Sequence, residues 1–221
     1  MSLPSRHALR GYHETYSTTF SGTTLPSGWT TYAGVPGGDP GAMFARSHVN
    51  VANGLLSIES WRDPVFANQW VTGGLCLCGL AGQTYGAYFV RSRITGAGAT
   101  GVELLWPDAN TWPPEIDFNE THGATGLTTA TVHWGTTDRQ SARTLHIDMT
   151  QWHTWGVVWS RTSILFTVDG HVWGSVRTAS QIPAIPMHLG LQTQTWCGLQ
   201  GTCPTSNSSM LVAWVSQYQI N

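Results

Sequence analysis

The nine-residue stretch WPPEIDFNE, residues 112–120, places Glu115, Asp117 and Glu120 in a segment that otherwise resembles a buried strand. The whole chain has only 12 acidic residues among 221, so this stretch is an acidic cluster. Burying unpaired carboxylates is costly, and neighbouring negative charges repel one another. The cluster therefore indicates either a metal site or a reaction that uses carboxyl groups.

Strand geometry decides which of these carboxyl groups can meet. Alternate residues of a strand share a face, which groups Glu115 with Asp117 and turns Glu120 away. A one-residue β-bulge after Asp117 would return Glu120 to their face. The two glutamates could then reach the ~5–5.5 Å separation of a retaining glycosidase. Two alternatives stay open here: a solvated strand face with alternating charge, and a calcium or magnesium site.

Length and charge restrict the possible partners. A chain of 221 residues fits one large all-β domain. With a formal net charge of −2 and 10% charged residues, it offers no basic stripe to nucleic acid. No apolar run approaches the ~18 residues of a membrane span. Residues 1–6 lack the apolar centre of a signal peptide, which leaves a cytoplasmic protein or one whose signal has been removed.

Short strand-like runs recur along the chain between turns rich in Gly, Thr, Ser and Pro, and no long helical pattern interrupts them. Regularly spaced short strands predict a β-sandwich or barrel in a single all-β domain. Asp169-Gly170 is typical of a hairpin turn. The runs predicted as strands are 54–60, 85–94, 101–106, 115–120, 128–134, 153–160, 163–170, 187–194 and 210–219.

Four cysteines allow several pairings. Cys197 and Cys203 bracket the polar loop GLQGT, which a disulfide could close. A bridge between Cys76 and Cys78 is disfavoured, because residues i and i+2 of an extended chain do not match disulfide geometry. A zinc site of all four cysteines would need the spacing C-x-C with C-x5-C, which is unusual for structural zinc.

WPPEIDFNE resembles the active-site strand of glycoside hydrolase family 16 in its bulged form, E-x-D-x-x-E. Further segments that resemble this family are TFSGTTLPSGW, NGLLSIES, YGAYFVRSRI, WHTWGVVWSRTSILFTVDG and MLVAWVSQYQ. The resemblance extends from about residue 16 to residue 218. It implies a β-jelly roll of two curved antiparallel sheets with a concave substrate cleft. We accordingly expect a catalytic domain over residues 16–221, preceded by a leader or arm over residues 1–15.

The resemblance also implies roles for the acidic residues. Glu115 would be the nucleophile and Glu120 the acid/base, with Asp117 orienting and supporting Glu115. The expected activity is that of a retaining endo-glycosidase acting on β-1,3-glucan or related β-glucans. Two other functions stay open on the same fold: a carbohydrate-binding protein without turnover, and a cell-wall transglycosylase. We expect a secreted or cell-surface monomer whose partner is a polysaccharide.

A structural calcium of this family is not expected here. Acidic residues that help to hold it in many members are replaced by Thr18, Thr19 and Ala213. We therefore expect no metal or other cofactor.

Aromatic residues near the motif are candidates for sugar binding, because clefts that hold glycans combine aromatic platforms with polar groups. We expect His133 to stand across a hairpin from Asp117, where it could hydrogen-bond a carboxylate or a substrate hydroxyl. Core packing is the alternative for each tryptophan, and a plain cross-strand pair for His133. The expected platforms are Trp106, Trp112, Trp134 and Trp196, whereas Trp152, Trp155, Trp159 and Trp214 are expected to be structural.

Overall fold

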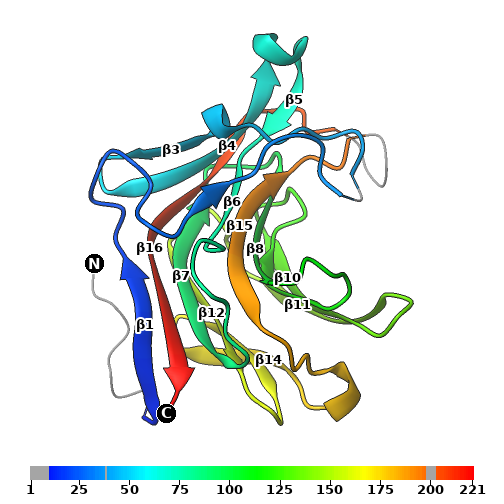
Figure 1. Cartoon of the computed structure of the whole chain (residues 1–221). Helices are drawn as coiled ribbons and strands as arrows, with labels where there is room; N and C mark the ends of the chain where they lie inside the picture. The colour runs from blue at the N-terminus through cyan, green and yellow to red at the C-terminus, as the bar shows by residue number, and fades with distance from the viewer. Residues whose placement is uncertain (1–9, 38, 198–202) are drawn as a thin grey trace.

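A computed structural model describes residues 10–37, 39–197 and 203–221 as two stacked β-sheets (Figure 1). Sheet A, with nine strands, has the order β14 (His171–Val176), β13 (Ile164–Val168), β12 (His153–Trp159), β7 (Gly86–Ile94), β16 (Ser208–Ile220), β4 (Leu55–Asp63) and β3 (Val49–Ala52), with β1 (Tyr12–Thr18) paired to β16 and β5 (Gln69–Thr72) paired to β4. Sheet B, with seven strands, has the order β11 (Arg139–His146), β10 (Leu127–Trp134), β9 (Glu115–Glu120), β8 (Thr100–Pro107), β15 (Met187–Gln194), β6 (Gly74–Cys76) and β2 (Thr30–Thr31).

The named strands of both sheets pair antiparallel throughout the described residues. This arrangement confirms the predicted sandwich of two antiparallel sheets. Helical structure in the described ranges is limited to the single 3-10 turns η2 (Arg46–His48), η3 (Pro64–Phe66) and η4 (Ala179–Gln181). No helix in this part of the chain is both long and apolar enough to cross a membrane.

The main hydrophobic core is built from both sheets. In β12, alternate residues Trp155, Val157 and Trp159 are fully buried, and Ile116 and Phe118 of β9 join the same cluster from sheet B. Fully burying a large apolar side chain contributes ~1.5–3 kcal/mol before the loss of chain entropy. The core therefore anchors β9 from one face, and the structural role expected for Trp155 and Trp159 is confirmed.

A smaller cluster lies on the other face of sheet A. Phe89 and Trp214 are buried there, and Trp152 packs against them from the segment before β12. The structural role expected for Trp152 and Trp214 is confirmed.

Each of the nine runs predicted as strands coincides with an observed strand. The predicted hairpin is also present: β13 and β14 are joined by Asp169 and Gly170, whose φ angles of 48° and 85° suit a two-residue type I′ turn. Six observed strands lie outside the predicted runs and the predicted hairpin: β1, β2, β3, β5, β6 and the polar β11. Because β1 begins at Tyr12, strand pairing starts before the expected domain boundary at residue 16. Residues 1–9 of the expected leader lie outside the described residues.

Both cysteine pairs form disulfides. The Cys197–Cys203 bridge is confirmed, although residues 198–202 between them lie outside the described ranges. The Cys76–Cys78 bridge contradicts our expectation, which assumed an extended chain. β6 ends at Cys76 and the chain bends at Leu77, so the two Cα atoms lie 5.1 Å apart. An extended chain would separate them by about 6.6 Å.

Candidate active site

The acidic cluster lies on β9, which is flanked by β8 and β10 in sheet B. From Asp117 to Glu120, β9 advances three residues while β10 advances two, from Thr131 to Thr129. β8 shows the same shift, because Asp117 and Asn119 face adjacent residues of that strand. The one-residue bulge predicted after Asp117 is therefore present.

The bulge determines which side chains share a face. Ile116 and Phe118 are fully buried in the core between the sheets. Glu115 and Asp117 point to the opposite side, here called the open face of sheet B. After the extra residue, Glu120 returns to this face, where it interacts electrostatically with Glu115 and Asp117. The structure thus brings together the three acids that the sequence singled out.

The surroundings of the two glutamates differ. Burial, and then the negative charge of Asp117, raises the pKa of Glu115 well above its usual range, while the charge of His133 and a hydrogen bond from Trp112 act in the opposite direction. Burial and the charge of Asp117 likewise raise the pKa of Glu120, to about 8, while the charge of His133 acts in the opposite direction here too. No hydrogen-bond donor to the Glu120 carboxyl group is found among the described residues. The hydrogen bond from Trp112 is thus the feature that distinguishes Glu115, and it favours the charged form of that carboxyl group.

His133 connects this cluster to the next turn. Its backbone partner in β9 is Glu115, and not Asp117 as we expected; the bulge accounts for one residue of this two-residue difference. The ring nevertheless reaches Asp117 diagonally, with Nε2 3.2 Å from Oδ2, while Nδ1 lies 2.7 Å from Oδ1 of Asp138. Burial lowers the pKa of His133, but the hydrogen bond and charge of Asp117, the hydrogen bond of Asp138 and the charge of Glu115 raise it to about 9. His133 is thus a cation at neutral pH.

Trp112 borders the candidate nucleophile. Its indole Nε1 donates a hydrogen bond to Oε2 of Glu115 over 2.8 Å, and its ring centroid lies 5.6 Å from that of His133. The side chain is nevertheless 46% exposed. The exposed ring thus lies beside the acidic residues, and its part in sugar binding stays a prediction. The hydrogen bond adds an electrostatic role that the sequence did not suggest.

The other expected platforms differ in position. Trp106 of β8 shares the face of Leu104, which pairs with Asp117, so it lies on the open face. Trp134 does not: it shares the face of Val132, which is in the core cluster, and the Arg139 guanidinium lies 3.6 Å from the centre of its ring. Our placement of Trp134 beside the acids is corrected, because strand alternation turns it away from His133.

Trp196 lies beyond the end of β15 and is half-buried, with a positive φ of 54°. Among the described residues it makes no hydrogen bond or ring contact with the acidic cluster. Its part in sugar binding stays a prediction.

Two further residues reach the cluster without having been predicted. Tyr32 lies against Gly74 and Gly190, where any Cβ atom would meet its ring or hydroxyl group. Burial, and then the charge of Glu115, raises the pKa of Tyr32. His122, just after the motif, places Nε2 3.7 Å from Oε2 of Glu120. Its closeness in sequence to Glu120 was a usable signal, whereas nothing near Tyr32 in the sequence pointed to the site.

Two groups of side chains have the spacing of metal ligands. In Glu115, Asp117 and His133, one candidate ligand atom from each lies within 4.8 Å of the others. Both ring nitrogens of His133 already contact carboxylates, Nε2 that of Asp117 and Nδ1 that of Asp138. The imidazolium therefore supplies the positive charge that a metal would otherwise provide. That no metal or other cofactor is needed stays a prediction.

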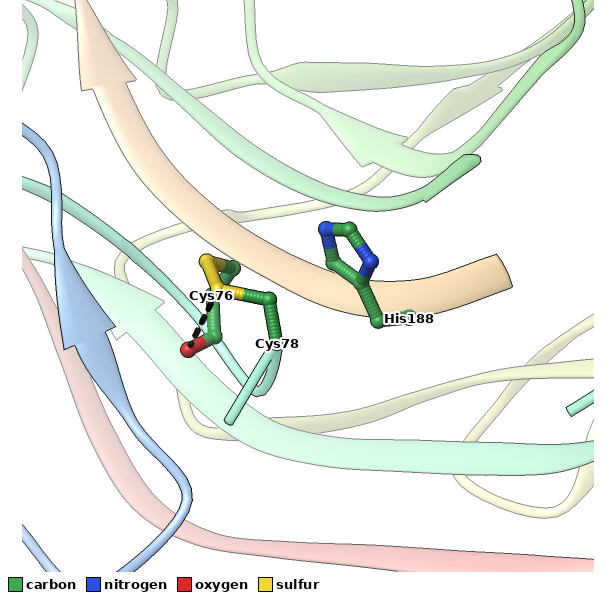
Figure 2. A group of neighbouring side chains, drawn as sticks. All are labelled: Cys76, Cys78 and His188. Carbon is green, nitrogen blue, oxygen red and sulfur yellow. Dashed lines mark hydrogen bonds between the residues drawn. A yellow bond between two sulfur atoms is a disulfide. The ribbon is translucent and has the colours of Figure 1, made fainter. Parts of the chain in front are cut away.

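The second group is Cys76, Cys78 and His188 (Figure 2). His188 projects from β15 beside the two sulfur atoms, and its Nδ1 lies 2.8 Å from Oδ1 of Asp108. Because the two sulfurs are bonded to each other, neither is a thiolate that could bind a soft metal. The group is a disulfide packed beside a histidine–aspartate pair.

Two curated relatives are similar over most of this chain. The endo-1,3-1,4-beta-glycanase EglC of Rhizobium meliloti (strain 1021) is 29% identical over 190 residues, which are 78% of this chain and 40% of the relative. The endo-1,3-1,4-beta-glycanase ExsH of the same organism is 26% identical over 200 residues, 84% of this chain and 42% of the relative. The chain thus spans about two fifths of the length of these relatives.

Solved structures share the fold. The laminarinase from Rhodothermus marinus superposes with a TM-score of 0.82 at 23% identity, covering 94% of this chain and 97% of that structure. The sequence profile of glycosyl hydrolases family 16 matches residues 77–216, more than half of the chain and the whole of the bulged acidic strand. The chain belongs to glycosyl hydrolases family 16.

Proposed function

We propose that this protein is a retaining endo-glycosidase that hydrolyses β-1,3-glucan or related β-glucans by double displacement. The observation that carries the proposal is the bulge in β9, which places Glu115 and Glu120 on one face with Asp117 between them. Retaining hydrolysis requires two carboxyl groups at short range, one charged and one protonated. Their different surroundings support this division of roles.

In the first step, Glu115 attacks the anomeric carbon as the bond to the leaving sugar breaks, and Glu120 gives its proton to the leaving oxygen. In the second step, Glu120 takes a proton from water, and the oxygen of that water displaces Glu115 from the anomeric carbon. Both carboxyl groups then regain their starting protonation states. Asp117 and the His133 cation form a pair beside the nucleophile that holds it in place and offsets its charge.

The choice of substrate rests on the surface and on the relatives. Trp112 and Trp106 offer apolar rings on the open face, which suit the faces of sugar rings. A chain with few charged residues suits a neutral polymer. The named relatives are endo-1,3-1,4-beta-glycanases and a laminarinase. A polymeric glucan also requires contact outside the cell, so secretion or surface display is part of the same proposal.

The test is the release of reducing ends from laminarin, lichenan, xyloglucan, agarose and carrageenan by the purified protein. We expect release from laminarin or lichenan, with a falling polymer length that shows internal cleavage. Glu115→Gln is the matched control, because it keeps the size of the side chain and removes the nucleophile. Equal release by wild type and this variant, or no release from any β-glucan, would overturn the proposal.

A further inference from the structure

A buried polar chain runs behind the bulge, on the core side of sheet B. It begins at Thr128 of β10, whose Oγ1 accepts a hydrogen bond from the backbone N–H of Glu120 over 3.0 Å. The same hydroxyl group donates to Oδ1 of Asn119 over 2.6 Å. Asn119 is one of the two consecutive core-side residues that the bulge creates, and it pairs in register with Glu103 of β8.

Glu103 is the last residue of this series of polar side chains and lies deep between the sheets. Its side chain is completely buried, and Oε1 accepts a hydrogen bond from Ser92 in the central strand of sheet A. The Asn119 amide also favours the charged carboxylate. Oε2 of Glu103 is buried and has no hydrogen-bond partner among the described residues. Burial outweighs the hydrogen bonds of Ser92 and Asn119 and raises the pKa of Glu103 to about 8.

An apolar side chain would fill this position at lower cost, because a buried carboxyl group gives up its hydration. Buried polar networks of this kind can instead specify one arrangement of the chain among several. Here the alternative arrangements are shifts of the bulge. A shift of one residue would exchange the faces of Asn119 and Glu120, and would turn the Glu120 carboxyl group into the core.

We propose that Glu103 is a positioning residue, which acts through Asn119 and Thr128 to hold the bulge in the register that presents Glu120 to the substrate. It does not touch the substrate, since it lies on the opposite face of sheet B from the three acids. Only the kinetic test of this inference rests on the proposed function.

The kinetic test compares two leaving groups. Glu103→Met removes the polar link at similar volume, and we expect kcat/KM on laminarin to fall about 30-fold to 100-fold, part of the ~10²–10⁴ that a general acid supplies. On a 2,4-dinitrophenyl β-oligoglucoside, whose leaving group needs little protonation, we expect kcat/KM to fall by less than about threefold. Equal losses on both substrates, or no loss on either, would overturn the proposal.

Matched variants separate positioning from stability. Glu103→Gln keeps hydrogen-bonding capacity for Ser92 and Asn119 and should retain most of the activity on laminarin. Thr193→Val removes a different buried hydroxyl group of sheet B, away from the bulge. It should leave the ratio of kcat/KM on laminarin to kcat/KM on the dinitrophenyl substrate unchanged. In an Asn119→Leu background, Glu103→Met should add little further loss, because the two residues act in series. Additive losses would contradict action through Asn119.

A measurement without substrate keeps the inference distinct from the proposed function. The Glu120 amide, which donates to Thr128, should exchange hydrogen at least about tenfold faster in Glu103→Met than in wild type. The Phe166 amide of β13, a strand that pairs with β12 and β14 and not with β8 or β9, should be unaffected. If wild type cleaves no glucan, the proposed function fails and this exchange still decides the inference. Unchanged exchange at Glu120 would then overturn it.

Discussion

The indole N–H of Trp112 donates to Oε2 of Glu115 over 2.8 Å, so an exposed aromatic residue is bonded to the candidate nucleophile. One side chain can therefore act in two ways: its ring offers a face to a sugar, and its N–H favours the charged form of the carboxyl group. Variants that remove one property at a time distinguish these contributions.

Trp112→Phe keeps a ring and removes the donor. Because the lost hydrogen bond lowers the pKa of Glu115, we expect the acid limb of the kcat/KM–pH profile to move to higher pH, with a small change in KM. Trp112→Ala should raise KM for long glucans about tenfold, as expected for lost binding. Trp134→Ala is the control: its ring lies on the core side under Arg139, so it should lower Tm and leave KM unchanged. An unmoved acid limb in Trp112→Phe would contradict the electrostatic role.

The acids should differ in how far they can be replaced. We expect Glu115→Gln and Glu120→Gln each to reduce kcat on laminarin by ~10³ or more, because covalent and proton-transfer roles need the carboxyl group itself. Asp117→Asn retains shape and a hydrogen-bonding oxygen, so we expect a smaller loss of about 10-fold to 100-fold. Circular dichroism and Tm establish that each variant is folded. Near-normal turnover by either glutamine variant would show that the roles are misassigned.

The alkaline limb of activity should report Glu120. Burial and the charge of Asp117 raise the pKa of Glu120 to about 8, and only its protonated form can protonate the leaving group. Activity should therefore persist through neutral pH and fall as the pH rises through about 8. Asp117→Asn removes a negative charge that raises this pKa, so the alkaline limb should move to lower pH. A limb that stays in place or moves upward in this variant would contradict the coupling.

His133 should stabilise the fold in a defined pH range. Its folded-state pKa, about 9, is raised above the ~6.5 of an unfolded histidine. A raised pKa contributes stability that is fully present below the unfolded value and is lost as pH rises through the folded one. The Tm difference between wild type and His133→Gln should thus be largest below pH 6.5 and shrink by pH 9.5. A constant difference would assign His133 a packing role only.

Much of the fold was predictable because its strands obey simple alternation. β12, with Trp155 and Trp159 on its core face, has the pattern that burial imposes on a strand. β11 was missed because nearly all of its side chains are exposed or half-exposed at the edge of sheet B. Because this edge strand is held by backbone pairing, its sequence does not show the alternation of apolar and polar residues that predicts a strand.

The site was predictable where it lies within one strand. The spacing of Glu115, Asp117 and Glu120 required a bulge if all three were to act together, and the bulge is present. Tyr32 could not be predicted, because it follows the two-residue strand β2, far from the motif, and reaches the site through tertiary packing alone. Trp134 was misplaced because proximity in sequence was given more weight than the face of the strand.

The stereochemistry of the products tests the bulge directly. With Glu120 and Glu115 on the same face, the carboxyl groups can approach the ~5–5.5 Å of a retaining site, which leaves no room for a water molecule between Glu115 and the sugar. Glu115 must then attack the anomeric carbon itself, and the second displacement restores the original configuration. A β-glucan should yield the β-anomer first, with the α-anomer appearing only through mutarotation. Proton NMR in the first minutes of digestion measures this order. Early α-anomer would require a wider, inverting site of ~6.5–9.5 Å, which two glutamates on one bulged strand face would not form.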